Sequence, residues 1–196
     1  PALVRPEVLG VYAIAASVAS MIAGAFGGLR SVVLSSVSRQ EAGEGEAVIL
    51  QMARLVIAAA VTAAAGLAIV GPFMIRLVYG SEFEGAITPM WLLLPGIVCF
   101  VVADLLLGAL AALDRPLDAT RATFAGLVVT VVGLAFLVRP YGASGAAFTS
   151  TAAYVTLFVL ELRALHRAGF PVRLLFRFDL IVEDVRGLSR LVAGRG

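Results

Sequence analysis

The sequence contains no lysine, one cysteine and one histidine, and only 14% of its 196 residues are charged. Without lysine, the chain has no side-chain amine for covalent catalysis. Cys99 has no second cysteine to pair with, and one cysteine with one histidine cannot build a zinc site or a cysteine–histidine catalytic pair. No phosphate-binding glycine loop or dinucleotide fingerprint is present. We therefore expect a protein that is not an enzyme, does not itself use ATP and needs no cofactor.

Hydrophobic residues make up 61% of the chain, and the mean hydropathy is +1.01. A soluble domain carries about 25% charged residues and could not bury so much apolar surface at this size. The composition predicts an all-α polytopic membrane protein. The formal net charge of +2 is therefore no sign of a nucleic-acid partner, and its meaning lies in which loops carry the arginines.

Long apolar runs predict five transmembrane helices, since about 20 apolar residues cross the hydrocarbon core. Pro72 predicts a kink in the second span, and Pro89 and Pro95, with Gly96, suggest a break in the third. The spans form a bundle over residues 1–167 and are expected at about 9–37, 48–79, 87–113, 122–138 and 146–165.

Two further patterns indicate how these helices pack and where the membrane surface lies. Gly24 and Gly28 form a GxxxG pattern, which favours close approach of a neighbouring helix. Aromatic residues near the expected span ends predict an interfacial belt. These are Tyr12, Tyr79, Trp91, Tyr141 and Tyr154.

The tail, residues 168–196, has a different pattern. Its apolar residues recur at steps of four and three, which places them on one helix face. They are Leu174, Phe178, Ile181, Val185, Leu188 and Val192. The pattern predicts a C-terminal amphipathic helix on the membrane surface, and a coiled-coil or partner-binding helix is the alternative.

Arginines are distributed unevenly between the two expected ends of the bundle. Three flank one end: Arg5, Arg76 and Arg139. Eight flank the other: Arg39, Arg54, Arg115, Arg121, Arg163, Arg167, Arg173 and Arg177. The positive-inside rule then places the C-terminus in the cytoplasm and the acidic turn at residues 80–85 outside.

Residues 72–116 carry a family resemblance. The pattern L-Y-G-x-x-F-x-x-A, then P-x-x-x-L-L-P-G, then a helix followed by R-P, resembles the second half of the polysaccharide (oligosaccharide–lipid) flippases. The matching residues are Leu77, Tyr79, Gly80, Phe83, Ala86, Pro89, Leu93, Leu94, Pro95, Gly96, Arg115 and Pro116. Two shorter matches lie at Gly10, Tyr12 and Ala15, and at Pro140, Tyr141, Gly142, Gly145, Ala146 and Ala147.

The resemblance implies that the chain is the C-terminal part of a twelve-helix, two-bundle transporter in the bacterial cytoplasmic (inner) membrane. Its superfamily also contains the lipid II flippases and multidrug antiporters. The implied function is to flip a polyprenyl-pyrophosphate-linked oligosaccharide by alternating access during synthesis of cell-surface polysaccharide, such as lipopolysaccharide. The implied partners are this lipid-linked oligosaccharide and the membrane lipids.

Charged residues at membrane depth are costly and are therefore candidate site residues. Arg30 and Arg54 can hold the pyrophosphate through paired hydrogen bonds, or can extend to the cytoplasmic interface as snorkelling side chains. Asp104 can bind a coupling cation (Na⁺ or H⁺) or pair with an arginine, or can have a structural role inside the bundle. We expect these three residues to form the substrate-binding set.

Two other functions are compatible with the sequence. One is a cation-coupled drug or lipid II exporter of the same superfamily, which would depend on Asp104. The other is a non-transporting membrane scaffold whose tail recruits a biosynthetic partner.

Overall fold

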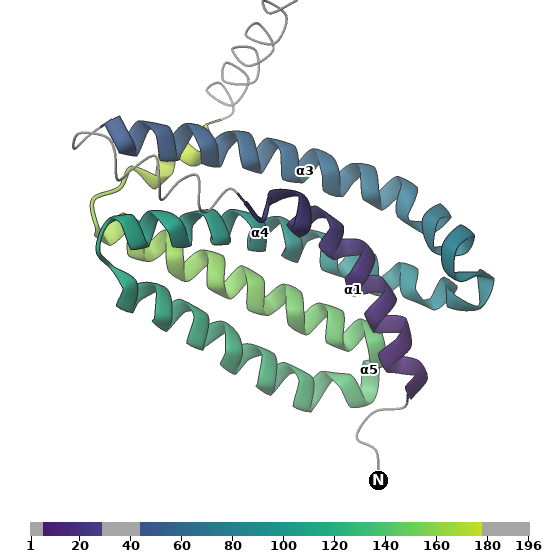
Figure 1. The fold of residues 1–196 in the computed structure, drawn as a ribbon. Helices are drawn as coiled ribbons and strands as arrows, with labels where there is room; N and C mark the ends of the chain where they lie inside the picture. The colour runs from purple at the N-terminus through teal and green to yellow at the C-terminus, as the bar shows by residue number, and fades with distance from the viewer. Residues whose placement is uncertain (1–5, 29–43, 178–196) are drawn as a thin grey trace, which may run out of the picture.

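The computed structural model describes residues 6–28 and 44–177, in which no strand occurs (Figure 1). The α-helices are α1 (Pro6–Phe26), α3 (Glu44–Tyr79), α4 (Ile87–Ala112) and α5 (Pro116–Arg167), and the 3-10 helices are η1 (Ser81–Ala86) and η2 (Val172–Phe176). Each of these four α-helices is long and apolar enough to cross a membrane. The described residues therefore confirm the prediction of an all-helical protein with long apolar helices, as expected for a membrane protein.

Helix α5 is bent into two arms, which lie side by side in Figure 1. The bend is at Gly142, whose φ of 56° and ψ of −131° are not helical. This left-handed conformation is open to glycine and strained for other residues. The connection between the spans expected at 122–138 and 146–165 is thus much shorter than predicted, because one glycine reverses the chain. Each arm is about 37 Å long, enough to cross a hydrocarbon core of about 30 Å, and the count of five crossings stays a prediction.

The chain reverses at two opposite ends of the bundle. At one end, α1 begins beside both the bend of α5 and η1. A Cβ atom added at Gly142 would lie 3.6 Å from Val8, and one added at Gly85 would lie 4.0 Å from Val11. The connection from α4 to α5 and the segment η2 lie at the other end (Figure 1). This alternation agrees with the expected order of the loops, and the side facing the cytoplasm stays a prediction.

Helix α4 is the centre of the bundle, with α1, α3 and α5 packed against it. Its sequence is apolar on nearly every face, which is typical of a helix enclosed by others. Large apolar side chains of α3 and α5 point outward instead, among them Ile69, Phe73 and Phe136, which are 80%, 65% and 75% exposed. Such a surface suits lipid rather than water.

The expected break of α4 at Pro95 is wrong, because α4 is continuous from Ile87 to Ala112. Proline removes one backbone donor from the helix. At this point Thr151 of α5 donates a hydrogen bond of 2.6 Å to the carbonyl oxygen of Leu92. Gly96 allows this approach, since an added Cβ atom would lie 2.7 Å from Cα of Thr151. This bond does not replace the one that Pro95 removes, which would end at the carbonyl oxygen of Trp91, but it joins α4 and α5 one residue further along.

The packing prediction for Gly24 and Gly28 is also wrong within the described residues. Helix α1 ends at Phe26, well before the expected boundary at residue 37, and residues 29–37 lie outside the described ranges. A Cβ atom at Gly24 or Gly28 would have nothing within 4 Å. Close approach occurs instead inside the α5 hairpin, where a Cβ atom at Gly133 would lie 2.5 Å from Thr149. Helix α1 packs through its alanine, valine and isoleucine face, which leaves its glycines on the opposite side.

The chain after α5 differs from the expected amphipathic helix at its start. Gly169 has a φ of 88° and Pro171 follows it, so α5 cannot continue. The chain then forms η2, in which Leu175 is fully buried, and Arg177 is extended. A continuous helix beginning near Leu174 is therefore wrong, and the remainder of that prediction, from residue 178, lies outside the described residues.

Candidate functional site

Three charged side chains lie within the apolar helices at positions enclosed by the bundle. Arg54 of α3 is 9% exposed and Glu161 of α5 is fully buried, while Asp104 of α4 is partly buried. Placing a charge in the bilayer interior is costly, so such residues face the bundle and mark candidate transport sites. Arg30, the third predicted site residue, lies outside the described residues.

The contacts between α3 and α4 show how deep Arg54 lies along the bundle. The indole nitrogen of Trp91 donates a 3.0 Å hydrogen bond to the carbonyl oxygen of Ala68, which places these two residues side by side. The two helices are antiparallel, and Arg54 lies 14 residues before Ala68. Moving 14 residues forward from Trp91 reaches Leu105, about 21 Å along each helix. Arg54 and Asp104 are therefore at nearly the same depth.

The contacts between α4 and α5 give the level of Glu161. The second arm of α5 runs parallel to α4, and the rings of Phe100 and Tyr154 pack with centroids 4.9 Å apart. Asp104 is four residues beyond Phe100, and Glu161 is seven residues beyond Tyr154. Both spacings return to the same helix face. The two carboxylates thus lie on the facing surfaces of α4 and α5, within about one helical turn of each other in depth.

The ring pair also corrects one part of the predicted aromatic belt. Tyr154 lies near the middle of the second arm of α5, so it is a packing residue and not an interfacial one. Tyr79 and Tyr141 are exposed beside the turns of the chain, as expected for residues at a membrane surface.

Of the two readings of Arg54, the structure favours the one inside the bundle. A snorkelling arginine keeps its charged group in water, whereas Arg54 is 9% exposed. For Asp104 both interpretations remain, a functional one (binding a cation or pairing with an arginine) and a structural role inside the bundle. Glu161 was missed by the sequence analysis, although it carries the same signal as Asp104, a lone carboxylate inside the apolar run TLFVLELRAL.

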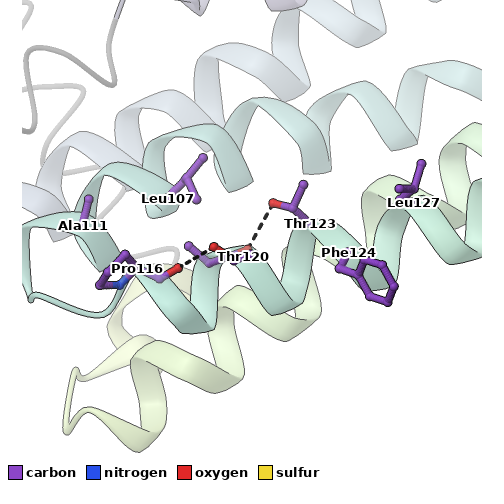
Figure 2. A pocket seen from close by; sticks show the side chains of 8 residues that line it. Leu107, Ala111, Pro116, Thr120, Thr123, Phe124 and Leu127 are labelled. Atoms are coloured by element: carbon purple, nitrogen blue, oxygen red, sulfur yellow. Dashed lines mark hydrogen bonds between the residues drawn. The ribbon is translucent and has the colours of Figure 1, made fainter.

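An open groove of about 460 Å³ lies near this level, between α4 and the first arm of α5 (Figure 2). Its polar groups are already used, because Thr120 and Thr123 donate hydrogen bonds of 3.0 and 3.1 Å to the carbonyl oxygens of Pro116 and Ala119. The remaining lining is largely apolar and includes Leu107 and Phe124. The groove therefore suits an apolar chain and not a sugar or a phosphate.

The described residues hold no group of three histidine, cysteine, aspartate or glutamate side chains that could bind a metal ion. The three charged residues can instead serve two kinds of chemistry. A guanidinium binds phosphate through two parallel hydrogen bonds, and buried carboxylates can bind a cation or carry a proton. No protein-family model, curated protein or solved structure matches the chain. The resemblance to the flippases therefore depends on the motif residues of the sequence alone.

Proposed function

We propose that this chain is part of a membrane transporter that flips a polyprenyl-pyrophosphate-linked oligosaccharide across the bacterial cytoplasmic membrane by alternating access. The observation that supports it most is the enclosure of Arg54, 9% exposed, within a bundle of apolar helices. The motif of residues 72–116 supports the same assignment. The identity of the substrate, an oligosaccharide on a polyprenyl carrier, is inferred from that resemblance.

The physical argument concerns the pyrophosphate. Its hydration must be replaced when the head group enters the membrane, since the hydrocarbon core offers no water. Arginine suits this task because its planar fork remains charged and matches phosphate oxygens. The carboxylates of Asp104 and Glu161, at nearly the same depth as Arg54, can balance its charge between transport cycles. The polyprenyl tail stays in the surrounding lipid.

Replacement of Arg54 by alanine tests this proposal. We expect surface polysaccharide in a complemented deletion strain to fall at least about tenfold, because a charge-assisted hydrogen bond contributes about 1.5–3 kcal/mol. Arg54→Lys keeps the charge without the fork and should retain part of the export. The matched control is Arg163→Ala, which removes an exposed arginine of α5. Normal export by a well-expressed Arg54→Ala variant would refute the role of Arg54.

A second function, a cation-coupled drug or lipid II exporter, is favoured by a separate observation. Asp104 and Glu161 lie on facing surfaces of α4 and α5, an arrangement suited to a transported cation or proton.

The Asp104→Asn variant separates the two functions. Under the exporter hypothesis, this neutral replacement should abolish resistance to the exported drug and its dependence on the ion gradient. Under the flippase hypothesis, drug resistance should not depend on the chain at all. The measurement is the minimal inhibitory drug concentration in strains that express equal amounts of the wild-type chain or of the Asp104→Asn variant. The control is Glu84→Gln, which changes an exposed acidic residue.

A further inference from the structure

A second groove lies between α1 and α5, at the end of the bundle where α5 bends. It has a volume of about 440 Å³ and is lined mainly by apolar side chains, among them Val8 and Leu9 of α1 and Leu134, Ala135 and Val138 of α5. This volume lies within the range of about 300–1,000 Å³ that is typical of ligand sites. We call it the α1–α5 groove.

The α1–α5 groove has two polar side chains in its lining, Tyr12 and Arg139. The hydroxyl of Tyr12 is 2.8 Å from the hydroxyl of Ser150 and forms a hydrogen bond with it. Arg139 is exposed and has no ion pair among the described residues. At the same end of the bundle, Arg76 is paired with Glu84 at 3.0 Å. The groove thus combines an apolar trough with a positive charge that forms no ion pair within residues 6–28 and 44–177.

Arg139 also lies at the right depth for a lipid head group. It is three residues before Gly142, where the chain reverses. Because each arm of α5 is about 37 Å long and the hydrocarbon core is about 30 Å thick, the ends of the arms reach the head-group region. The apolar part of the groove extends from there along α1 and α5 toward the interior of the membrane.

We propose that the α1–α5 groove binds an anionic membrane phospholipid. The guanidinium of Arg139 contacts the phosphate and head group, and an acyl chain lies between α1 and α5. Charge complementarity selects this occupant, since a zwitterionic lipid carries no net charge to compensate Arg139. The site is independent of the transported substrate, because it uses neither Arg54 nor the carboxylates of the central bundle.

Native mass spectrometry of the full chain in detergent tests the head-group contact. The probes are phosphatidylglycerol and phosphatidylcholine with identical acyl chains, titrated separately. We expect the wild-type chain to bind phosphatidylglycerol about fivefold more tightly, as one arginine near an anionic head group provides. Arg139→Gln should abolish this preference, Arg139→Lys should keep it, and the control Arg163→Gln should not change it. Equal binding of the two lipids by the wild-type chain, or an unchanged preference in Arg139→Gln, would overturn the proposal.

A groove-filling variant tests the acyl-chain contact separately. Ala135→Trp should weaken the binding of phosphatidylglycerol at least about fivefold by occupying the α1–α5 groove. Its control is Ala65→Trp, which places the same side chain at an exposed position of α3. Unaltered lipid binding by Ala135→Trp, with the helical content of the wild-type chain, would show that no acyl chain lies in the groove.

Discussion

Replacement of Gly96 by alanine is expected to lower the free energy of unfolding by about 1–3 kcal/mol. The added Cβ atom would lie 2.6 Å from Oγ1 and 2.7 Å from Cα of Thr151. The second contact is with backbone, so α4 and α5 must move apart. This movement also breaks the hydrogen bond from Thr151 to the carbonyl oxygen of Leu92, which is 2.6 Å long. Thermal unfolding in detergent, monitored by size-exclusion chromatography, measures this loss of stability.

Gly66 provides a control with the opposite expected sign. It also lies inside a long helix, α3, but a Cβ atom there would have nothing within 4 Å. Alanine at this position removes a flexible residue without a clash and is expected to raise stability by up to about 1 kcal/mol. If both variants lose the same stability, the effect of Gly96→Ala belongs to the helix backbone and not to its contact with Thr151.

The glycines of the helices show what the sequence can and cannot predict about packing. Apolar length predicts that α3 and α4 are helices, and the residues GSEFEG at 80–85 predict the turn between them. Neither feature tells which face of a helix meets its neighbour. The GxxxG pattern therefore predicted close packing at Gly24 and Gly28, whereas close contacts occur at other glycines, among them Gly96, Gly133 and Gly145. A glycine's environment depends on the partner helix, which lies far away in the sequence.

The prolines illustrate the same limit. A proline at position 95 predicts a weakened helix from its own chemistry. The helix is continuous all the same, and Thr151, 56 positions further along the chain, donates a hydrogen bond to the carbonyl oxygen of Leu92 beside the proline. Near Gly142 the sequence predicted a connection between two spans, whereas the structure reverses the chain at this one glycine, whose φ of 56° and ψ of −131° other residues rarely adopt. Local chemistry thus predicts turns better than it predicts the effect of a proline inside a packed bundle.

The candidate site was predicted in part for a similar reason. A charge inside an apolar run is visible in the sequence, and this signal identified Arg54 and Asp104. Their common depth is not visible, because it depends on how α3 and α4 are aligned through Trp91 and Ala68. Glu161 became a candidate only when its full burial and its place on the α4–α5 interface were known.

Glu161→Gln is expected to reduce transport at least about tenfold while the chain remains folded, because the amide keeps the shape of the side chain and can neither bind a cation nor take up and release a proton. In the fully buried environment of Glu161, no water can replace the carboxyl group in either task. The measurement is surface polysaccharide in a complemented deletion strain under the flippase hypothesis, or drug resistance under the exporter hypothesis. Glu84→Gln, at an exposed ion pair, is the control and should transport normally.

A double-mutant cycle then asks whether Glu161 and Asp104 act together. If both carboxylates serve one site, Asp104→Asn should have a smaller effect in the Glu161→Gln background than in the wild type, with a coupling energy of at least about 0.5 kcal/mol. Additive effects would mean that the two residues act separately, despite their places on facing surfaces of α4 and α5. Full transport by Glu161→Gln would remove it from the site altogether. Arg54 would then remain as the charged group that the enclosed level of the bundle offers to a phosphate.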